Sequence, residues 1–171
     1  MVIGVGAIGG SILASLRLGG VPAIGVARGE NGRVMATDGL LLRTPDGDFL
    51  THPLIWSGPA EAELHEHDVL VVATKTQQAQ VALAQWSGVP VGERTAGEVL
   101  PVLMCTNGVA SEEMALRYFR RVFAVCVWSP SQHFESGVVL NYRRGAVGEF
   151  HVSRYPAGLT TPEDRALTAQ L

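Results

Sequence analysis

The sequence predicts an α/β fold in which a mostly parallel β-sheet is flanked by helices. Three observations support this prediction. Short β-type runs alternate along the chain with helix-type runs. The strongest run, residues 68–74, is continuously apolar and β-branched, as strands buried on both faces are. A glycine-rich turn, residues 4–9, joins the first strand to the first helix. Together these features are typical of a doubly wound, Rossmann-type sheet.

The expected strands are short and apolar. They cover residues 1–5, 22–27, 39–43, 49–52, 68–74, 98–105, 122–128 and 137–142. The strands 39–43 and 49–52 are predicted to pair as a hairpin, because Pro45-Asp46-Gly47-Asp48 between them is a turn sequence. Pro101 is expected at or before the start of its strand, because proline donates no hydrogen bond to a sheet.

The expected helices cover residues 9–18, 77–86, 111–120 and 161–171. The last of these has a clear beginning. Thr161 is suited to cap it and Pro162 to be its first residue. Glu163 and Asp164 follow in the first turn, where acidic side chains interact favourably with the helix dipole.

Composition excludes several classes of protein. Apolar residues make up 47% and charged residues 17%, which argues against disorder. The net charge of -3 and the absence of a basic stripe argue against nucleic-acid binding. No run has the roughly 18 apolar residues of a membrane helix, and residues 1–16 lack the basic start of a signal peptide. Cys105 and Cys126 are expected as buried, reduced thiols, as in a cytoplasmic protein.

No metal site is expected. His65 and His67 flank Glu66, but this order has no known metal-binding geometry, and the other histidines are scattered. The two cysteines also lack a metal-binding spacing.

The first strand and helix are joined by Gly4-Val5-Gly6-Ala7-Ile8-Gly9, which fits the pattern G-x-G-x-x-G of dinucleotide-binding proteins. Gly4 allows the tight turn, and Gly6 lets the backbone approach a pyrophosphate. Gly9 lets the helix pack closely on its strand, and the helix N-terminus offers N–H groups to the phosphates. The alternatives are an ordinary strand–helix turn and a flavin or S-adenosylmethionine site.

The residue after the second strand distinguishes NAD from NADP. An acidic residue there would hold the ribose 2′-hydroxyl, whereas arginine pairs with a 2′-phosphate. This chain has Arg28 at that position, and Arg33 is near enough to assist. The sequence therefore favours NADP(H). Two alternatives stay open: Glu30 serves NAD instead, or Arg28 is a solvated loop residue.

Polar residues follow two of the buried runs. Thr74 and Lys75 end the run 68–74, and Asn107 follows the run 98–105. Because parallel strands end at one edge of a sheet, Lys75 and the glycine loop are expected to face one crevice. There the ammonium group would hold cofactor or a substrate carboxylate, and Asn107 would reach the nicotinamide ribose or the substrate. The alternatives are a surface lysine and an ordinary Asn-Gly turn.

Three motifs in this order resemble the ketopantoate reductase family. They are residues 4–10, residues 72–78 (Val-Ala-Thr-Lys-Thr-Gln-Gln) and residues 106–109 (Thr-Asn-Gly-Val). Residues 135–139 and 153–158 are also similar to the family, so the resemblance covers nearly the whole chain. It implies NADPH-dependent reduction of a 2-keto acid, 2-dehydropantoate, to pantoate in pantothenate biosynthesis.

The resemblance also implies roles for individual residues. The residues matching Gly4 to Gly9 cradle the pyrophosphate, and the residue matching Arg28 meets the 2′-phosphate. The residues matching Lys75, with Thr74 before it, and Asn107 bind the cofactor and approach the substrate. The family carries its general-acid lysine on a helix of an all-α second domain, whereas Lys75 is the only lysine of this chain. No catalytic residue is therefore expected here.

The expected domain organisation is an NADP-binding domain, residues 1–160, followed by the start of a truncated helix, residues 161–171. A 2-keto acid would bind only when a second domain completes the site. The exposed docking face would allow homo-oligomers to form. The chain is then the NADPH-binding domain of a reductase, with little turnover alone. A non-catalytic NADP(H) sensor or partner subunit is the alternative, and a degenerate fragment that binds nothing is a third interpretation.

Overall fold

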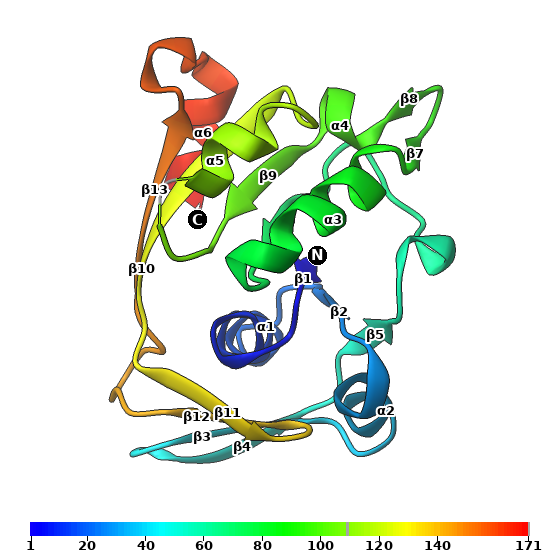
Figure 1. The fold of residues 1–171 in the computed structure, drawn as a ribbon. Helices are drawn as coiled ribbons and strands as arrows, with labels where there is room; N and C mark the ends of the chain where they lie inside the picture. The colour runs from blue at the N-terminus through cyan, green and yellow to red at the C-terminus, as the bar shows by residue number, and fades with distance from the viewer. Residues whose placement is uncertain (109, 171) are drawn as a thin grey trace. The chain divides into compact units, whose positions relative to one another are not determined.

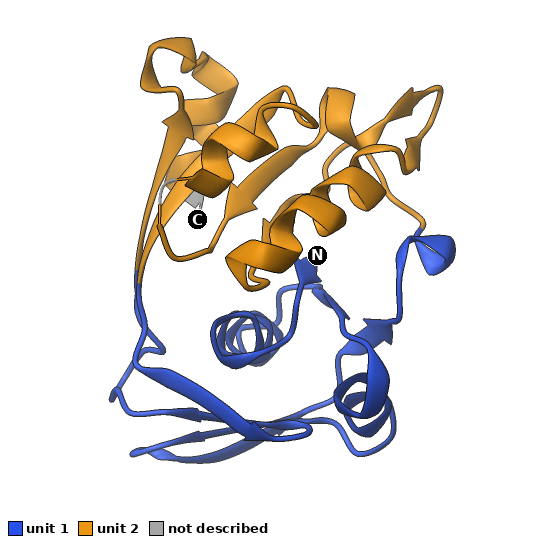
Figure 2. Ribbon diagram, in the orientation of Figure 1, with its two compact units in different colours: residues 1–62, 128–149 blue, residues 63–127, 150–171 orange. Residues whose placement is uncertain are grey.

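The computed structural model describes residues 1–108 and 110–170. The chain forms two compact units, which Figure 2 shows in blue and orange. Unit 1 contains Met1–Ala62 and Trp128–Glu149, and unit 2 contains Glu63–Val127 and the described residues from Phe150 onward. Two predicted residues, Val109 of the Asn-Gly motif and Leu171 of the last helix, lie outside the described part.

Unit 1 begins with three parallel strands, β1 (Val2–Ile3), β2 (Ile24–Val26) and β5 (Leu54–Trp56). They lie in the order β1-β2-β5, with Val2 opposite Gly25 and Ile24 opposite Leu54. Helix α1 (Ala7–Leu18) joins β1 to β2, and α2 (Gly29–Thr37) follows β2 (Figure 1). A short 3₁₀ helix, η1 (Pro59–Glu61), follows β5.

Unit 1 also has a second sheet with the strand order β11-β12-β3-β4 (Figure 1). The predicted hairpin is confirmed as β3 (Leu40–Thr44) paired antiparallel with β4 (Gly47–Thr51). The predicted strand 137–142 is confirmed as β12 (Val138–Asn141), which runs parallel to β3. Strand β11 (Ser131–Glu135) completes the sheet. These strands therefore belong to a separate sheet from β1, β2 and β5.

Helix α1 packs against this second sheet through a residue without a side chain. A Cβ atom on Gly10 would lie 2.5 Å from Cγ2 of Val139 on β12. Glycine is therefore needed where the helix and the sheet meet. Leu13 of α1 is fully buried in the same unit, and its Cδ2 atom lies in the space that a side chain on Gly25 would occupy.

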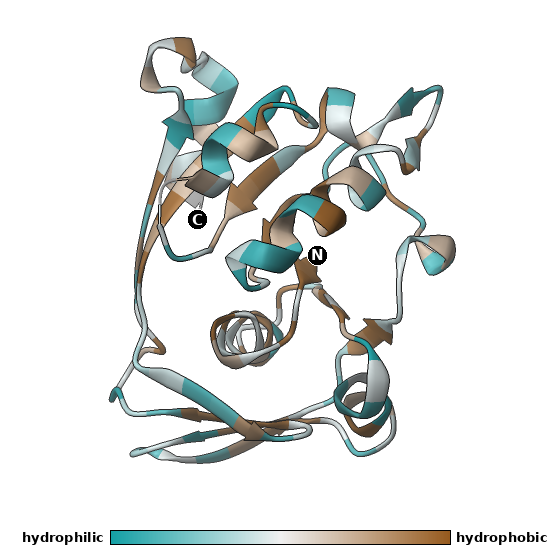
Figure 3. Ribbon diagram, viewed as in Figure 1, coloured by the Kyte–Doolittle hydropathy of each residue, from teal (hydrophilic) through white to brown (hydrophobic). Residues whose placement is uncertain are grey.

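Unit 2 contains the strands β6 (Leu70–Val72) and β9 (Pro101–Met104), and all but one residue of each of β10 (Arg121–Trp128) and β13 (Glu149–Tyr155). Their order is β6-β9-β10-β13, and the pairs β6–β9 and β9–β10 are parallel. All residues of β6 and β9 are buried, and Figure 3 shows β9 as an apolar strand. Pro101 is the first residue of β9, as predicted.

The other elements of unit 2 are short. Its helices are α3 (Thr76–Ser87), α4 (Ala96–Val99), α5 (Ala110–Ala115) and α6 (Pro162–Gln170), with a 3₁₀ turn η2 (Ala157–Leu159). A small antiparallel pair, β7 (Pro90–Val91) and β8 (Arg94–Thr95), precedes α4. No helix in the described ranges is long and apolar enough to cross a membrane.

The start of α6 is fixed by a buried acid. Thr161 and Asp164 exchange hydrogen bonds: the Asp164 N–H donates to Oγ1 of Thr161, and the Thr161 N–H donates to Oδ2 of Asp164 (3.2 and 3.1 Å). Asp164 also accepts from Arg121 at 2.9 Å and from Arg154 at 3.2 Å. The predicted beginning of this helix is confirmed, and its acid also joins α6 to β10 and β13.

The predicted helix 111–120 is too long, since α5 ends at Ala115. After Ala115 the backbone tightens, because the Arg117 N–H donates to the Met114 carbonyl and the Tyr118 N–H to the Ala115 carbonyl. These are 3₁₀-type bonds, which commonly end a helix. The turn lets Phe119 become buried and lets the Arg120 N–H donate to the carbonyl of Gly97.

One of the two expected buried thiols is not buried. Cys105 is buried, but Cys126 on β10 is exposed. Alternation along a strand puts neighbouring side chains on opposite faces, so an apolar run does not bury every residue in it.

Candidate cofactor-binding site

The glycine loop lies in unit 1 between β1 and α1. Gly4 has φ +91°, a conformation that glycine adopts readily and other residues rarely. Its N–H donates to the carbonyl of Val26 at the end of β2 (3.0 Å), which ties the loop to the neighbouring strand. Gly6 is the N-cap of α1, and its carbonyl accepts from the Gly10 N–H at 2.8 Å.

Gly6 faces open space, although it lies in the middle of the loop. A Cβ atom added to Gly6 would meet no atom within 4 Å, so protein packing does not require glycine here. The first turn of α1 carries no acidic side chain. The N-terminal N–H groups of a helix lack partners within the helix and carry a partial positive charge. This end of α1 can therefore accept an anionic group close to the backbone.

Arg28 lies two residues after the end of β2 and is the N-cap of α2. The side chain is exposed, and Gly29 after it has φ +61°. A guanidinium group beside a helix N-terminus combines two features that attract a phosphate. The structure thus puts Arg28 and the glycine loop in the same unit, at the ends of the paired strands β2 and β1.

The alternative role for Glu30 is weakened by its partner. Arg33 donates two hydrogen bonds to the Glu30 carboxylate, at 2.9 and 2.6 Å. The hydrogen bond from Arg33 lowers the pKa of Glu30, so this carboxylate is ionised at neutral pH. Both of its oxygens are already engaged. The same pairing turns the Arg33 guanidinium toward Glu30.

Thr74, Lys75 and Asn107 lie in unit 2, where β6 and β9 end. The two strands run parallel with Val72 opposite Met104, and the Cys105 N–H donates to the Val72 carbonyl at 2.8 Å. Beyond the strands, Oγ1 of Thr76 donates to the Asn107 carbonyl at 3.1 Å. The loops that carry Lys75 and Asn107 are therefore joined directly.

The side chains at this edge are partly exposed. Lys75 is the N-cap of α3 and is exposed, as is Asn107. Thr74 differs, because its Oγ1 atom is buried and has no hydrogen-bond partner among the described residues. A buried hydroxyl without a partner is unfavourable, and such groups in folded proteins often await a water or a ligand.

A buried polar cluster supports the loop that carries Asn107. The hydroxyls of Thr106 and Ser111 are hydrogen-bonded, and Oγ of Ser111 donates to Oε2 of Glu112 at 3.2 Å. All three residues are buried. None of the three was predicted as a site residue; a serine and an acid shortly after Asn-Gly are the sequence signal of such a loop.

Cys105, at the end of β9, is not a candidate nucleophile. Burial raises the pKa of its thiol to about 12. The reactive form of cysteine is the thiolate, which this thiol does not form near neutral pH.

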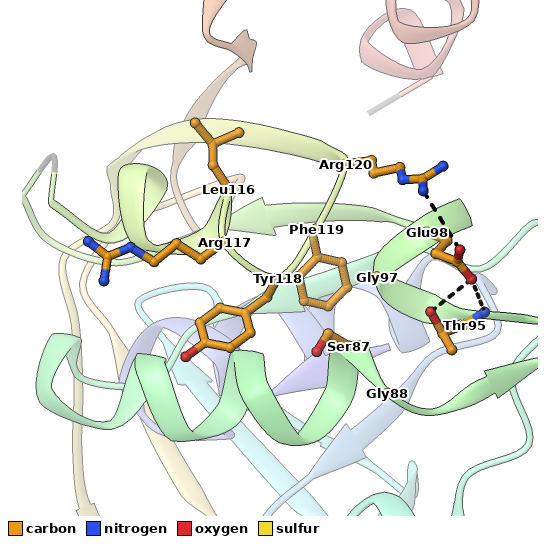
Figure 4. Close-up of a pocket in the computed structure, with 10 residues that line it drawn as sticks. All are labelled: Ser87, Gly88, Thr95, Gly97, Glu98, Leu116, Arg117, Tyr118, Phe119 and Arg120. Carbon is orange, nitrogen blue, oxygen red and sulfur yellow. Dashed lines mark hydrogen bonds and ion pairs between the residues drawn. The ribbon is translucent and has the colours of Figure 1, made fainter.

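Unit 2 also has a shallow depression of about 610 Å³, lined by residues at the ends of α3, α4 and α5 (Figure 4). Its lining includes Gly97 and Glu98 before β9 and Arg120 before β10, so it borders the amino ends of these strands. Figure 4 shows Arg117 and Arg120 pointing apart, with Arg120 directed toward Glu98 at 3.7 Å. These side chains do not converge on a ligand, and the predicted site residues are not among the lining.

The sequence matches the model of one protein family, described as ketopantoate reductase PanE/ApbA, over residues 1–156. The chain belongs to the ketopantoate reductase family. Ketopantoate reductases are NAD(P)-dependent oxidoreductases. No curated protein matches this sequence significantly.

Solved structures confirm the Rossmann-type fold. A 2-dehydropantoate 2-reductase from Geobacter metallireducens is 22% identical with a TM-score of 0.78, over 99% of this chain and 54% of that one. The enzyme of the same name from Porphyromonas gingivalis is 24% identical with a TM-score of 0.75, over 97% and 57%.

A third similar structure has a different name. It is D-mandelate dehydrogenase with NADH and anilino(oxo)acetate, which is 16% identical with a TM-score of 0.79, over 99% of this chain and 52% of that one. The chain therefore spans about half the length of the solved structures it matches. One fold thus occurs in proteins of different names.

Proposed function

We propose that this ketopantoate reductase chain binds NADPH. The glycine loop would hold the pyrophosphate and Arg28 the 2′-phosphate. The observation that carries the proposal is the open space over Gly6 at the N-terminus of α1, in the same unit as Arg28 at the N-terminus of α2. Backbone N–H groups at a helix N-terminus bind phosphate, and arginine forms strong paired hydrogen bonds with it.

The preference for NADPH over NADH depends on charge at the end of β2. NAD-binding sites commonly use an acid there, which would repel a 2′-phosphate. In this chain the acid nearest to Arg28, Glu30, is held by Arg33. While Arg33 neutralises the Glu30 carboxylate, Arg28 adds positive charge at the end of β2, which favours NADPH over NADH.

The proposed reaction of the whole protein is the reduction of a 2-keto acid, 2-dehydropantoate, to the 2-hydroxy acid pantoate. NADPH supplies the hydride when it is bound. Within this chain Lys75 and Asn107 would orient the nicotinamide end and the substrate, and Thr74 would donate its buried hydroxyl to one of them. The names of the solved structures support this substrate.

A titration tests the cofactor proposal. The purified chain is titrated with NADPH and with NADH while nicotinamide fluorescence is followed, and both titrations are repeated with Arg28→Ala. Loss of a charge-assisted contact weakens binding by about 1.5–3 kcal/mol, or roughly 10- to 150-fold. We expect this loss for NADPH and little change for NADH.

Arg43→Ala is the matched control, because Arg43 is another exposed arginine of unit 1 and pairs with Asp48 on the hairpin. It should bind both nucleotides as the unmodified chain does. Equal weakening of NADPH and NADH by Arg28→Ala would contradict the assignment of the 2′-phosphate. Failure of the unmodified chain to bind either nucleotide would contradict the proposed function.

A further inference from the structure

One side-chain amide joins the glycine loop to two other parts of unit 1. Asn31 lies in the first turn of α2 and is half-buried. Its Nδ2 donates to the carbonyl of Val5 at 2.8 Å. Its Oδ1 accepts from the N–H of Gly137 at 2.9 Å and from Nε2 of His133 at 3.0 Å. The amide thus connects α2 with the glycine loop and with the turn between β11 and β12.

The backbone partners determine which way this amide points. A carbonyl only accepts hydrogen bonds and a backbone N–H only donates them. The Asn31 nitrogen must therefore face Val5, and its oxygen must face Gly137. With the oxygen so placed, Nε2 of His133 is the donor in the third bond. All the hydrogen-bonding atoms of the arrangement are consistent with one orientation.

The turn between β11 and β12 is packed closely enough to hold the Asn31 amide in place. Gly137 has φ +75°, and a Cβ atom on it would lie 2.7 Å from Cγ1 of Val34, one turn further along α2. The β11–β12 turn therefore lies directly against α2. Asn31 is anchored by this contact on one side and donates to the loop on the other.

The bond to Val5 has a geometric consequence for Gly6. The peptide unit between Val5 and Gly6 is planar and trans, so its C=O and N–H point in opposite directions. Since the Val5 carbonyl points toward Asn31, the Gly6 N–H must point away from Asn31. Gly6 is the residue with open space around it.

We propose that Asn31 is a positioning residue, which fixes the Val5–Gly6 peptide so that the Gly6 N–H is directed at the cofactor pyrophosphate. This inference rests on the proposed function, because it assumes that the glycine loop binds NADPH. Asn31 touches no phosphate itself. It also fixes the start of α2, where Arg28 lies, so one amide sets both phosphate contacts.

Two variants distinguish the loss of the hydrogen bond to Val5 from the effect of an added negative charge. Asn31→Asp keeps the shape and the acceptor oxygen but loses the donor to Val5. Asn31→Ala loses the donor and stays uncharged. The matched control is Asn141→Asp, because Asn141 is another buried amide of unit 1 that donates to a backbone carbonyl, that of Val147, at 2.6 Å.

NADPH affinity is measured by nicotinamide fluorescence at a temperature where each variant is folded. We expect the Kd to rise about tenfold or more in both Asn31 variants, as for loss of one oriented donor to a charged group. We expect it to stay within about twofold in Asn141→Asp, even where that control lowers stability. A residue that only stabilised the fold would affect binding no more than Asn141 does.

The Gly6 amide resonance in ¹H–¹⁵N NMR spectra gives a second readout. In the unmodified chain it should move on NADPH addition, and in Asn31→Ala this movement should be reduced. Unchanged affinity in Asn31→Ala, or weakening by Asn31→Asp alone, would overturn the positioning role, because charge repulsion would then explain the effect. If the unmodified chain binds no NADPH, the proposed function fails first and the positioning role fails with it.

Discussion

At the scale of single residues, the glycines in and just after the loop are needed for different reasons. Gly4 is required by its own backbone, since φ is +91°. Gly10 is required by packing, since a side chain would collide with Val139. Neither requirement applies to Gly6, which has a negative φ of −98° and open surroundings. The G-x-G-x-x-G pattern treats Gly4 and Gly6 alike and omits Gly10, whereas the structure gives Gly4 a backbone requirement and Gly10 a packing requirement.

This difference makes a testable prediction about Gly6→Ala and Gly4→Ala. We expect Gly6→Ala to change the free energy of unfolding by less than about 1 kcal/mol, because the added methyl group meets no neighbouring atom. NADPH binding should nevertheless weaken at least tenfold, since the methyl group occupies the space of the pyrophosphate. Gly4→Ala should lower the free energy of unfolding by about 1–2 kcal/mol, because alanine is strained at positive φ.

Urea unfolding and NADPH titration of the two variants measure these effects. Normal NADPH affinity in Gly6→Ala would contradict the assignment of the phosphate site. A stability loss in Gly6→Ala as large as that in Gly4→Ala would show that the space over Gly6 is filled by protein.

The glycine motif and Arg28 could be predicted from sequence because each has a local context, a strand followed by a helix. Asn31 could not be predicted in this way. Its partners are the backbone atoms of Val5 and Gly137 and the ring of His133, which are far apart in the chain. No periodic pattern records a hydrogen bond from a side chain to a distant backbone atom.

At the scale of elements, most apolar strands and the long helices were predicted. The short apolar strand β5 (Leu54–Trp56), helix α2 and the polar strands β11 and β13 were missed. Helix α2 begins Gly-Glu-Asn-Gly and has two glycines, which lower helix propensity. Its tertiary contacts outweigh that propensity. Strand β11 (Ser-Gln-His-Phe-Glu) is mostly polar and partly exposed, so it lacks the apolar run of a buried strand. Strand β13 was missed for a similar reason, since alternate residues of it are exposed.

The contact of α6 with β10 and β13 depends on one acid, Asp164. The contribution of this acid to the free energy of unfolding should depend on pH. Burial by itself raises the pKa of Asp164, but hydrogen bonds from Thr161 and Arg121 outweigh it and lower the pKa below its ordinary value. An acid with a lowered pKa stabilises the fold fully above its unfolded pKa of about 3.9, and the stabilisation is lost as pH falls through the folded pKa.

Asp164→Asn should therefore lower the free energy of unfolding by about 3–5 kcal/mol at neutral pH, as for removal of one member of a buried ion pair. The side chain of Arg154, which is only 6% exposed, would lose its charged partner. The difference in free energy of unfolding between the variant and the unmodified chain should shrink below about pH 4. Urea unfolding over a range of pH measures this difference.

Glu163→Gln is the control for this prediction, because Glu163 is an exposed acid in the same helical turn. It should change the free energy of unfolding by less than about 0.5 kcal/mol. If the difference in free energy of unfolding between Asp164→Asn and the unmodified chain did not change with pH, the charge of Asp164 would not contribute to stability.

At the scale of the whole molecule, the proposed cofactor residues are divided between the two units. The glycine loop and Arg28 belong to unit 1, whereas Thr74, Lys75 and Asn107 belong to unit 2. We expect NADPH to change the protection of backbone amides in each set.

Hydrogen exchange followed by mass spectrometry measures this prediction. NADPH should slow exchange of backbone amides in residues 4–10 of unit 1 and in residues 74–77 and 105–108 of unit 2, because bound ligand suppresses local opening. Arg28→Ala should reduce both effects at a fixed NADPH concentration. Protection confined to unit 1 would mean that Lys75 and Asn107 do not take part in binding the nucleotide.

The composition of unit 1 from two distant pieces of chain has a consequence for how the protein folds during synthesis. Strand β3 pairs with β12, so Leu41 meets Val138, and α1 packs on a sheet whose β12 has yet to be made when α1 emerges. The first 62 residues therefore leave the ribosome without the strand that covers their apolar side chains. Folds dominated by such long-range pairings form slowly. Residues 1–62 of the nascent chain thus have an extended interval in which they depend on chaperones or on their own residual structure to avoid aggregation.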